Sequence, residues 1–165
     1  MKTLIVYATK YGCTEKCVNI LKSYLAMETD VFNAKSNKIR LEEYDTVIIG
    51  GSVYMGKIQK EISHFCKRNI KKLLKKKIGL FACCYTPNGT DGFFETLFPI
   101  ELLHHASCVT CVGGEMNYEK MNYFYRKMFQ TLKKIDGFNE GFTEPKINQK
   151  EIKKLAEVFN SQISQ

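Results

Sequence analysis

Five short apolar runs alternate along the chain with longer segments in which apolar residues recur at helical spacing. The runs cover Lys2–Ala8, Thr29–Asn33, Thr46–Gly50, Ile78–Cys84 and Cys108–Val112. Several of them are almost continuously apolar, which is typical of parallel strands that are covered on both faces. The alternation of such strands with helices predicts a doubly wound α/β sheet, with all 165 residues in a single domain.

The segments with helical periodicity are Thr14–Met27, Lys57–Lys76, Phe93–His105, Glu119–Lys134 and Gln149–Ile163. The last of them has a clear start signal, because Asn148 is a favourable N-cap and Glu151 follows three residues later as its capping-box partner. Residues 34–43 are few and polar, so we expect only a helical turn or a loop there.

Composition places the chain among globular proteins, with 44% apolar and 25% charged residues. The apolar run at the N-terminus is too short for a signal peptide, and the other runs fall far short of the about 20 residues that cross a bilayer. Seven cysteines, an odd number scattered through the expected strands and helices, indicate reduced thiols. We therefore expect a cytoplasmic protein without a membrane span.

Two cysteine pairs have spacings that metal or redox sites also use. Cys108 and Cys111 form a Cys-X-X-Cys motif, and Cys13 and Cys17 lie four residues apart on an expected helix. No second such motif accompanies the first, and free cysteine packs as a small hydrophobic residue. Packing is therefore the favoured interpretation of both pairs. The three histidines also lie in helical patterns, and we predict no metal site.

The net charge of +8 is concentrated in residues 67–77, which suggests a surface for nucleic acid or anionic membrane. Apolar residues recur at helical intervals through the same segment, so the lysines fit the solvated face of a helix. We favour the second interpretation and expect no nucleic-acid partner.

The turn between the first strand and the first helix collects groups that bind anions. Thr9 and Thr14 supply hydroxyls, Gly12 permits a sharp turn, and the first helical turn presents unpaired N–H groups. Such a turn is also an ordinary cap. Its place after the first strand favours a ligand, because ligands in these sheets bind beyond the carboxyl ends of the strands.

Three segments together resemble the flavodoxin family. The first, Thr9-Lys10-Tyr11-Gly12-Cys13-Thr14, resembles the flavodoxin phosphate loop. The second, Asp45–Lys57, is similar to the third strand and the loop that flanks the flavin, where the resemblance places Ser52, Val53, Tyr54, Met55 and Gly56 along the isoalloxazine ring. The third follows the fourth strand, and its implied flavin-binding residues are Cys84, Tyr85, Thr86, Asn88, Gly89 and Gly92.

The resemblance implies a flavodoxin-like sheet of five parallel strands in the order 2-1-3-4-5, with helices on both faces and flavin mononucleotide (FMN) as cofactor. Within the family the likeness is greatest to the flavodoxin-type, quinone-coupled protoporphyrinogen dehydrogenases. They share the Met-Lys-Thr-Leu-Ile opening, a Gly-X-Ser-X-X-X-Gly second loop and an aromatic, basic insertion, here near residues 114–140. Cys13 departs from the Asn of many flavodoxins, and the insertion contains less Arg than those enzymes have.

These features leave three functions open. One is an FMN-dependent oxidoreductase that acts on a small quinone-like or porphyrinogen-like molecule, in which the flavin carries the reaction and no catalytic acid or base is required. The others are an electron-transfer protein that serves a protein partner, and a basic binding module without flavin. The stripe of residues 119–134 fits a helix packed on its own domain or one that docks on an anionic membrane, a substrate or a second subunit as a homodimer.

Two further expectations concern the flavin environment. Tyr54 and Tyr85 are candidates to stack on the ring. The three loops contain two basic residues, Lys10 and Lys57, and a single acidic one, Asp91. Electron-carrier flavodoxins, by contrast, surround the flavin with acidic residues. We expect a less negative reduction potential than in such carriers, since positive charge favours an anion.

Overall fold

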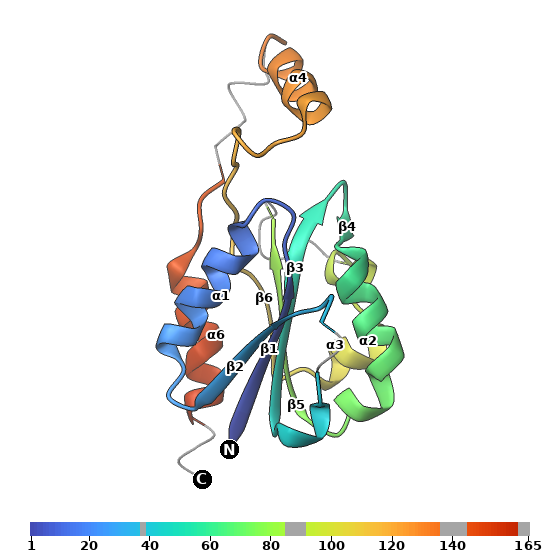
Figure 1. Cartoon of the computed structure of the whole chain (residues 1–165), viewed down its shortest axis with the longest axis vertical. Coiled ribbons are helices and arrows are strands. Elements are labelled where there is room, and N and C mark those ends of the chain that lie inside the picture. Colours follow the sequence, from blue (N-terminus) through green and yellow to red (C-terminus); the bar gives the residue numbers. More distant parts are fainter. Residues whose placement is uncertain (37–38, 85–91, 136–144, 162–165) are drawn as a thin grey trace.

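The computed structural model describes residues 1–36, 39–84, 92–135 and 145–161. In this part of the chain the central sheet is parallel and has the order β2-β1-β3-β5-β6 (Figure 1). Its strands are β1 (Lys2–Ala8), β2 (Glu28–Asn33), β3 (Thr46–Tyr54), β5 (Lys77–Cys83) and β6 (Cys108–Cys111). The order is the one predicted, since β5 and β6 are the fourth and fifth strands of the sequence pattern.

A short sixth strand was not predicted. β3 continues to Tyr54, turns at Met55 and Gly56, and pairs antiparallel with β4 (Lys57–Ile58). Both turn residues have positive φ angles, 48° and 72°, as a two-residue type I′ hairpin requires. The expected helix start at Lys57 is therefore wrong, and α2 runs over Lys60–Leu73.

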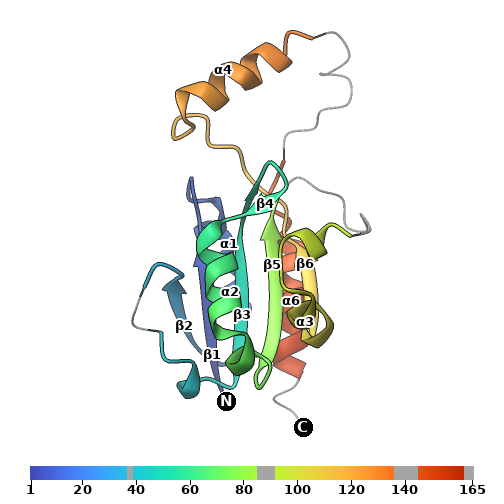
Figure 2. The same cartoon turned by 90° about the vertical axis from the view of Figure 1, so that its right-hand side faces the viewer.

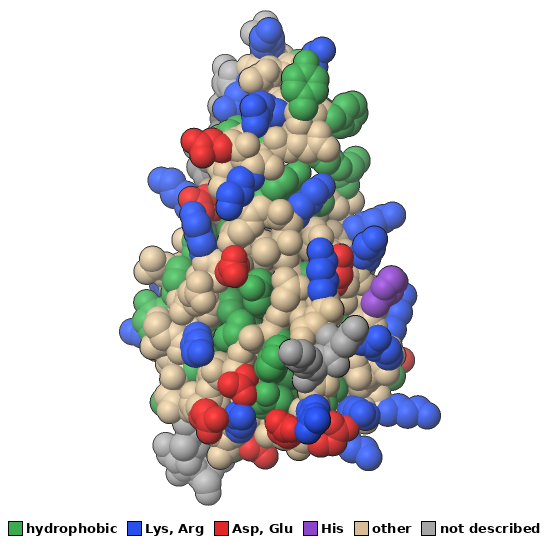
Figure 3. Space-filling model, viewed as in Figure 1, with side chains coloured by type: hydrophobic (Ala, Val, Ile, Leu, Met, Phe, Trp, Pro, Cys, Tyr) green, Lys and Arg blue, Asp and Glu red, His purple; other side chains and the backbone are tan. Residues whose placement is uncertain are grey.

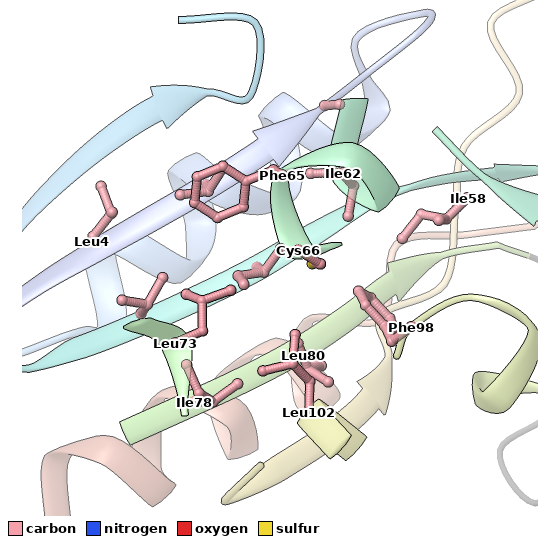
Figure 4. Close-up of a cluster of buried hydrophobic side chains, with 14 of the residues drawn as sticks. Leu4, Ile58, Ile62, Phe65, Cys66, Leu73, Ile78, Leu80, Phe98 and Leu102 are labelled. Atoms are coloured by element: carbon pink, nitrogen blue, oxygen red, sulfur yellow. The ribbon is translucent and has the colours of Figure 1, made fainter. Parts of the chain in front are cut away.

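Helices cover both faces of the sheet (Figures 1 and 2). α1 (Cys13–Tyr24) and α6 (Gln149–Asn160) lie together on one face, and α2 and α3 (Ile100–His105) lie on the other. Two buried clusters result. Figure 4 shows the cluster under α2, which contains Ile62 and Phe65 of the helix and Leu80 of β5. Under α1 and α6, Phe159 and Phe81 are almost fully buried.

The lysine-rich segment confirms the amphipathic pattern. Ile62, Phe65 and Leu73 of α2 are buried, whereas Lys67 and Lys71 are exposed. Lys and Arg side chains are spread over the visible face of the molecule in Figure 3. The lysines of α2 thus occupy the solvated face of a helix that packs on the sheet.

The helix expected over Phe93–His105 is divided. It consists of a 3-10 turn, η2 (Phe94–Thr96), and the short α3. Pro99 separates them, because proline lacks an N–H and pushes the residue before it out of the helical region. The brief turn expected in residues 34–43 is confirmed as η1 (Leu41–Glu43).

One of the two hydrogen bonds of the expected capping box at the last helix is confirmed. The Asn148 side chain accepts a hydrogen bond from the Glu151 N–H (3.2 Å). The Glu151 carboxylate does not return a bond to Asn148. It accepts instead from the Lys154 ammonium (2.6 Å) and the Thr110 hydroxyl (3.1 Å), which ties α6 to β6. The expected end at Ile163 lies outside the described residues.

The insertion leaves the sheet after β6 and returns before α6. Gly113 and Ile147 form an antiparallel bridge, and the Asn148 N–H donates to the Val112 carbonyl (2.8 Å). Between them, α4 covers Tyr123–Leu132, shorter than the expected Glu119–Lys134, and Asn122 caps its N-terminus. Figures 1 and 2 show α4 beyond the carboxyl ends of the strands, apart from the sheet. Among the described residues no helix is long and apolar enough to cross a membrane.

Candidate flavin site

Three loops meet at the carboxyl edge of the sheet because the strands before them are in register. Ala8 of β1 pairs with Gly51 of β3, and Ser52 pairs with Cys83 of β5. The segments that start at Thr9, Ser52 and Cys84 therefore leave the sheet side by side. β1 is also the strand at which the order reverses, the usual ligand position in doubly wound folds.

The first loop is a closed turn at the start of α1. The Thr9 hydroxyl accepts a hydrogen bond from the Gly12 N–H (2.9 Å), and Gly12 has a φ of 92°, which favours glycine. The N–H groups of the next residues have no acceptor within the helix, and the helix dipole adds positive potential there. This turn is built to receive an anion.

Two buried hydroxyls at this edge have no partner among the described residues. They belong to Thr14, which is fully buried, and Ser52, which is 5% exposed. An unsatisfied buried hydroxyl costs about 1–3 kcal/mol, so native proteins rarely keep one without a ligand or water beside it. Both residues belong to the predicted site. Because their hydroxyls have no partner, each can form a hydrogen bond with a bound ligand.

A cavity of about 240 Å³ lies between the second loop, the third loop and the insertion. Its lining includes Ser52, Val53, Tyr54, Cys83 and Cys84 from the strand ends and Cys13 from α1. Gly114, Glu115, Met116, Phe129 and Pro145 of the insertion complete it. The site thus brings Cys13 together with Ser52, Val53, Tyr54 and Cys84, as the sequence predicts.

The remaining predicted residues are placed differently. Met55 and Gly56 form the tip of the hairpin, where Met55 is 81% exposed. Gly92 is exposed before η2, with a φ of 74°. Tyr85, Thr86, Asn88 and Gly89 lie outside the described residues, as does Asp91.

Aromatic rings and a lysine form the outer rim of the cavity. The rings of Tyr11 and Tyr54 meet edge to face at 5.6 Å. The Lys10 ammonium lies 5.3 Å from the Tyr11 ring, 5.1 Å from the Tyr54 ring and 4.8 Å from the ring of Tyr125 in α4. Burial raises the pKa of Tyr54 well above its ordinary value, so this phenol stays protonated. The rim is therefore aromatic, with a positive charge at its centre.

The insertion contributes residues that the sequence did not assign to the site. The Lys120 ammonium lies over the phosphate-loop turn, 3.9 Å from the position that a Cβ of Gly12 would take. The Tyr11 hydroxyl accepts a hydrogen bond from the Asn122 N–H (3.4 Å), and Glu115 binds Lys16 of α1 (2.6 Å). Local patterns could not reveal these contacts, because they depend on how the insertion folds back over the strands.

Cysteine sulfurs gather at the floor of the cavity. The Sγ atoms of Cys13, Cys17 and Cys83 all lie within 4.8 Å of one another. The adjacent thiols of Cys17 and Cys83 lower the pKa of Cys13, and their interaction with Cys13 raises the pKa of Cys17 and Cys83. The interpretation of Cys13 and Cys17 as packing residues alone therefore misses their grouping with Cys83.

The Cys-X-X-Cys motif does not form a pair of its own. Cys108 and Cys111 point to opposite faces of β6, as residues three apart in a strand do. The Cys111 sulfur lies 3.2 Å from that of Cys84, at the end of the neighbouring strand.

A second cavity, of about 420 Å³, is larger and lies between α2 and residues 95–101. It contains none of the predicted site residues. It also lacks the combination of unpaired hydroxyls and a helix start that marks the first. We therefore place the site at the strand ends.

The residues present suit FMN. Unpaired N–H groups, the Thr14 hydroxyl and Lys120 match a phosphate, the Ser52 hydroxyl matches a polar edge, and the aromatic rim suits a flat ring. An open α/β sheet with such a site at its switch point defines a mononucleotide-binding class of protein.

Comparison with known proteins identifies the family. Residues 4–142 match the flavodoxin domain family, and the chain belongs to it. A curated relative, the protoporphyrinogen IX dehydrogenase [quinone] of Escherichia coli K12, is 24% identical over 149 residues, which are 83% of this chain and 81% of the relative.

Two solved structures that cover 99% of this chain agree on the fold. A WrbA-like flavodoxin from Agrobacterium tumefaciens is 16% identical, with a TM-score of 0.52 and coverage of 99% of this chain and 98% of that one. The rubredoxin:oxygen oxidoreductase of Desulfovibrio gigas gives 13% identity and a TM-score of 0.54 over 99% of this chain, which spans only 36% of the length of that protein. A Fusobacterium nucleatum flavodoxin bound to flavin mononucleotide is 24% identical over half of each chain, with a TM-score of 0.41.

Proposed function

We propose that the chain binds one FMN at the carboxyl edge of the sheet and works as an FMN-dependent oxidoreductase. The observation that carries this proposal is the pair of buried, unpartnered hydroxyls of Thr14 and Ser52 beside the helix start and the cavity. Membership of the flavodoxin family supports it.

Two sets of residues would contact different parts of the cofactor, one the phosphate and the other the ring. The turn Thr9–Thr14 and Lys120 would hold the phosphate, since they present N–H groups, hydroxyls and positive charge. Ser52, Val53, Tyr54 and Cys84 would border the ring. FMN would supply hydride or single-electron transfer when bound, and the residues of this chain would position it and exclude water.

A Thr14→Val variant tests the binding site directly. Valine has nearly the shape of threonine, so the fold loses only a hydroxyl that has no partner. We expect the apoprotein to be as stable as the wild type or slightly more stable, and FMN to bind about 10-fold more weakly. Binding is measured by the absorbance and fluorescence changes on titration with FMN. Thr46→Val is a matched control, because its hydroxyl is also buried and unpartnered but lies at the opposite end of β3. If the wild-type protein causes no change in the absorbance or fluorescence of added FMN, the proposed site is refuted and a binding module without flavin is favoured.

The curated relative and the insertion support a quinone-like or porphyrinogen-like substrate. The curated relative is a quinone-coupled protoporphyrinogen dehydrogenase, and the insertion here covers the cavity with Met116 and Phe129. An apolar cover suits a flat, hydrophobic substrate such as a quinone or a porphyrinogen. Sustained oxidation of a reduced donor by a soluble quinone would support the enzyme.

The alternative is an electron carrier that serves a protein partner. The match to the flavodoxin domain family favours this alternative. Reduction by a reductase that stops at one equivalent of FMN, with no turnover on quinones, would favour the carrier over the enzyme.

A peripheral membrane location would bring the site close to such hydrophobic substrates. α4 exposes Tyr123 (73%), Phe124 (69%) and Met128 (40%), and Lys127 lies on the same helix. An amphipathic helix with aromatic and basic residues is the kind that binds anionic lipid surfaces. The same face would serve a homodimer if lipid binding is absent.

A further inference from the structure

The three sulfurs of Cys13, Cys17 and Cys83 come from two elements that the fold holds rigidly together. Cys13 and Cys17 lie four residues apart on α1 and so face the same side of the helix, and Cys83 ends β5. All three belong to the core between α1 and the sheet, where Cys17 is 2% and Cys83 4% exposed. Packing therefore fixes their relative positions before any ligand arrives.

The spacing of the sulfurs matches one shared ion. Three thiolates bound at about 2.3 Å to the same ion lie roughly 4 Å from one another. The three Sγ atoms lie within 4.8 Å of each other, so a shift of a few tenths of an ångström brings them into place. Ordinary packing gives no reason for three thiols to point at a common centre.

The surroundings meet the other requirements of a metal site. The Glu115 N–H donates to the Cys13 sulfur (3.1 Å), which orients this ligand from outside as second-layer groups do. The start of α1 and the Lys16 ammonium lie on the same side and favour negative charge on the sulfurs. Cys13 and Cys83 line the cavity, which gives an ion a path from solvent.

We propose that Cys13, Cys17 and Cys83 bind one Cu(I) ion as three thiolates. Soft sulfur ligands select Cu(I) and Zn(II) over harder cations. Zn(II) takes four ligands in nearly all structural sites, and within the described residues no further Cys, His, Asp or Glu completes this group. Three sulfurs around a largely buried centre suit the lower coordination number of Cu(I). This site shares Cys13 with the phosphate turn, and Cys13 and Cys83 also line the cavity assigned to FMN.

Copper competition tests the proposal on the full chain, under anaerobic conditions that keep the thiols reduced. Cu(I) is supplied as a coloured chelator complex, and its transfer to the protein is followed by the loss of colour. We expect the wild type to take up about one Cu(I) per chain, with three sulfur neighbours by X-ray absorption spectroscopy, and to release protons as the thiols ionise. Uptake is measured on the FMN-free protein, in which the cavity gives copper access to the sulfurs.

Matched cysteine variants locate the site. Cys17→Ala and Cys83→Ala should each reduce uptake to about a tenth or less, and Cys17→Ser provides a second version in case the alanine protein is unstable by urea denaturation. Cys66→Ala, which removes a buried thiol on the other face, and Cys111→Ala, which removes one member of the close pair with Cys84, should leave uptake unchanged. The proposal is wrong if the wild type takes up no copper, if Cys111→Ala abolishes uptake while Cys17→Ala does not, or if equimolar Zn(II) displaces the bound copper.

Discussion

The ring of Phe81 occupies the space that a side chain on Gly50 would need. A Cβ atom at Gly50 would collide with three ring carbons of Phe81, which is buried in the neighbouring strand. Gly50 lies two residues before Ser52, so the ring supports β3 at the point where the strand enters the candidate site. The absence of a side chain at Gly50 of β3 thus leaves room for the Phe81 ring of the neighbouring strand β5.

Gly50→Ala should therefore destabilise the fold. We expect a loss of about 1–3 kcal/mol in the free energy of unfolding in urea, which is typical of an overpacked core. A Gly50→Ala/Phe81→Leu double variant should recover part of it, because leucine vacates the space. Gly51→Ala is a milder comparison, since its Cβ would meet the Ile62 side chain at 3.0 Å. Equal stability of Gly50→Ala and the wild type would contradict the steric interpretation.

Lys120 offers a test that separates phosphate recognition from ring recognition. Its ammonium lies over the turn of Gly12, so Lys120→Gln should weaken FMN binding by about 3- to 10-fold while it leaves riboflavin, which lacks the phosphate, unaffected. Titrations with both ligands measure the two effects. Lys133→Gln on the same insertion is the control, and its ammonium lies instead over the rings of Tyr118 and Phe129. A parallel loss of both affinities in Lys120→Gln would point to a general change in the insertion.

Lys10 should influence the reduction potential of bound FMN. Its positive charge at the aromatic rim favours added negative charge nearby, so Lys10→Gln should lower the potential by roughly 20–60 mV, up to a tenfold change in a one-electron equilibrium constant. Lys57→Gln, on the exposed strand β4, should have a smaller effect. Potentials are measured by spectroelectrochemical titration of the FMN-loaded proteins. An unchanged or raised potential in Lys10→Gln would show that the charge of Lys10 does not raise the reduction potential of bound FMN.

Asp30 links stability to pH at the other end of the sheet. Its carboxylate accepts from Lys2 (2.8 Å) and from the Tyr44 hydroxyl (2.9 Å), and the Lys2 bond is the main cause that lowers the pKa of Asp30. A lowered native pKa adds stability above the unfolded-state pKa of about 3.9, and this contribution is lost as the pH falls through the native value.

Asp30→Asn should therefore be less stable than the wild type by about 0.5–1 kcal/mol at pH 7, a small amount because the pair is partly solvated. The difference should shrink towards zero near pH 2. Urea unfolding at several pH values measures it, with Glu28→Gln, the more exposed partner of Lys2, as a comparison. A difference that stays constant down to pH 2 would show that the ionised carboxylate is not its source.

Flotation with lipid vesicles tests the membrane role of α4. The wild type should float with vesicles that contain anionic lipid and remain behind with neutral ones, because both apolar burial and charge contribute. Phe124→Ser should reduce flotation several-fold. Ile100→Ser removes an exposed apolar side chain (44%) from α3 on the body of the protein and should have no effect. Absence of flotation together with a concentration-dependent dimer would assign the face of α4 to a second copy.

Prediction from sequence succeeded where the signal was local and periodic. The buried strands and amphipathic helices follow from apolar spacing, and the Thr9–Thr14 turn follows from residue types at a strand end. It failed where two residues adopt an unusual conformation. Met55 has a positive φ although methionine gives no hint of it, and this hidden turn converted an expected helix start into β4.

Non-local contacts set the second limit. Cys83 joins Cys13 and Cys17 only because strand register brings the end of β5 under α1. Lys120 reaches Gly12 across more than a hundred residues of chain. Neither neighbour could be found from spacing in the sequence, since the distance in space depends on the assembled sheet and insertion.

The bridge between Gly113 and Ile147 means that the long excursion begins and ends at almost the same point. Partners in an antiparallel bridge have Cα atoms only about 5 Å apart, a gap that a tight turn can span. None of the described residues between them belongs to a strand of the sheet. Replacing residues 114–146 by a short turn would therefore separate the sheet from the cover of the cavity, and a different excursion placed on the same stem would give the cavity a different lining.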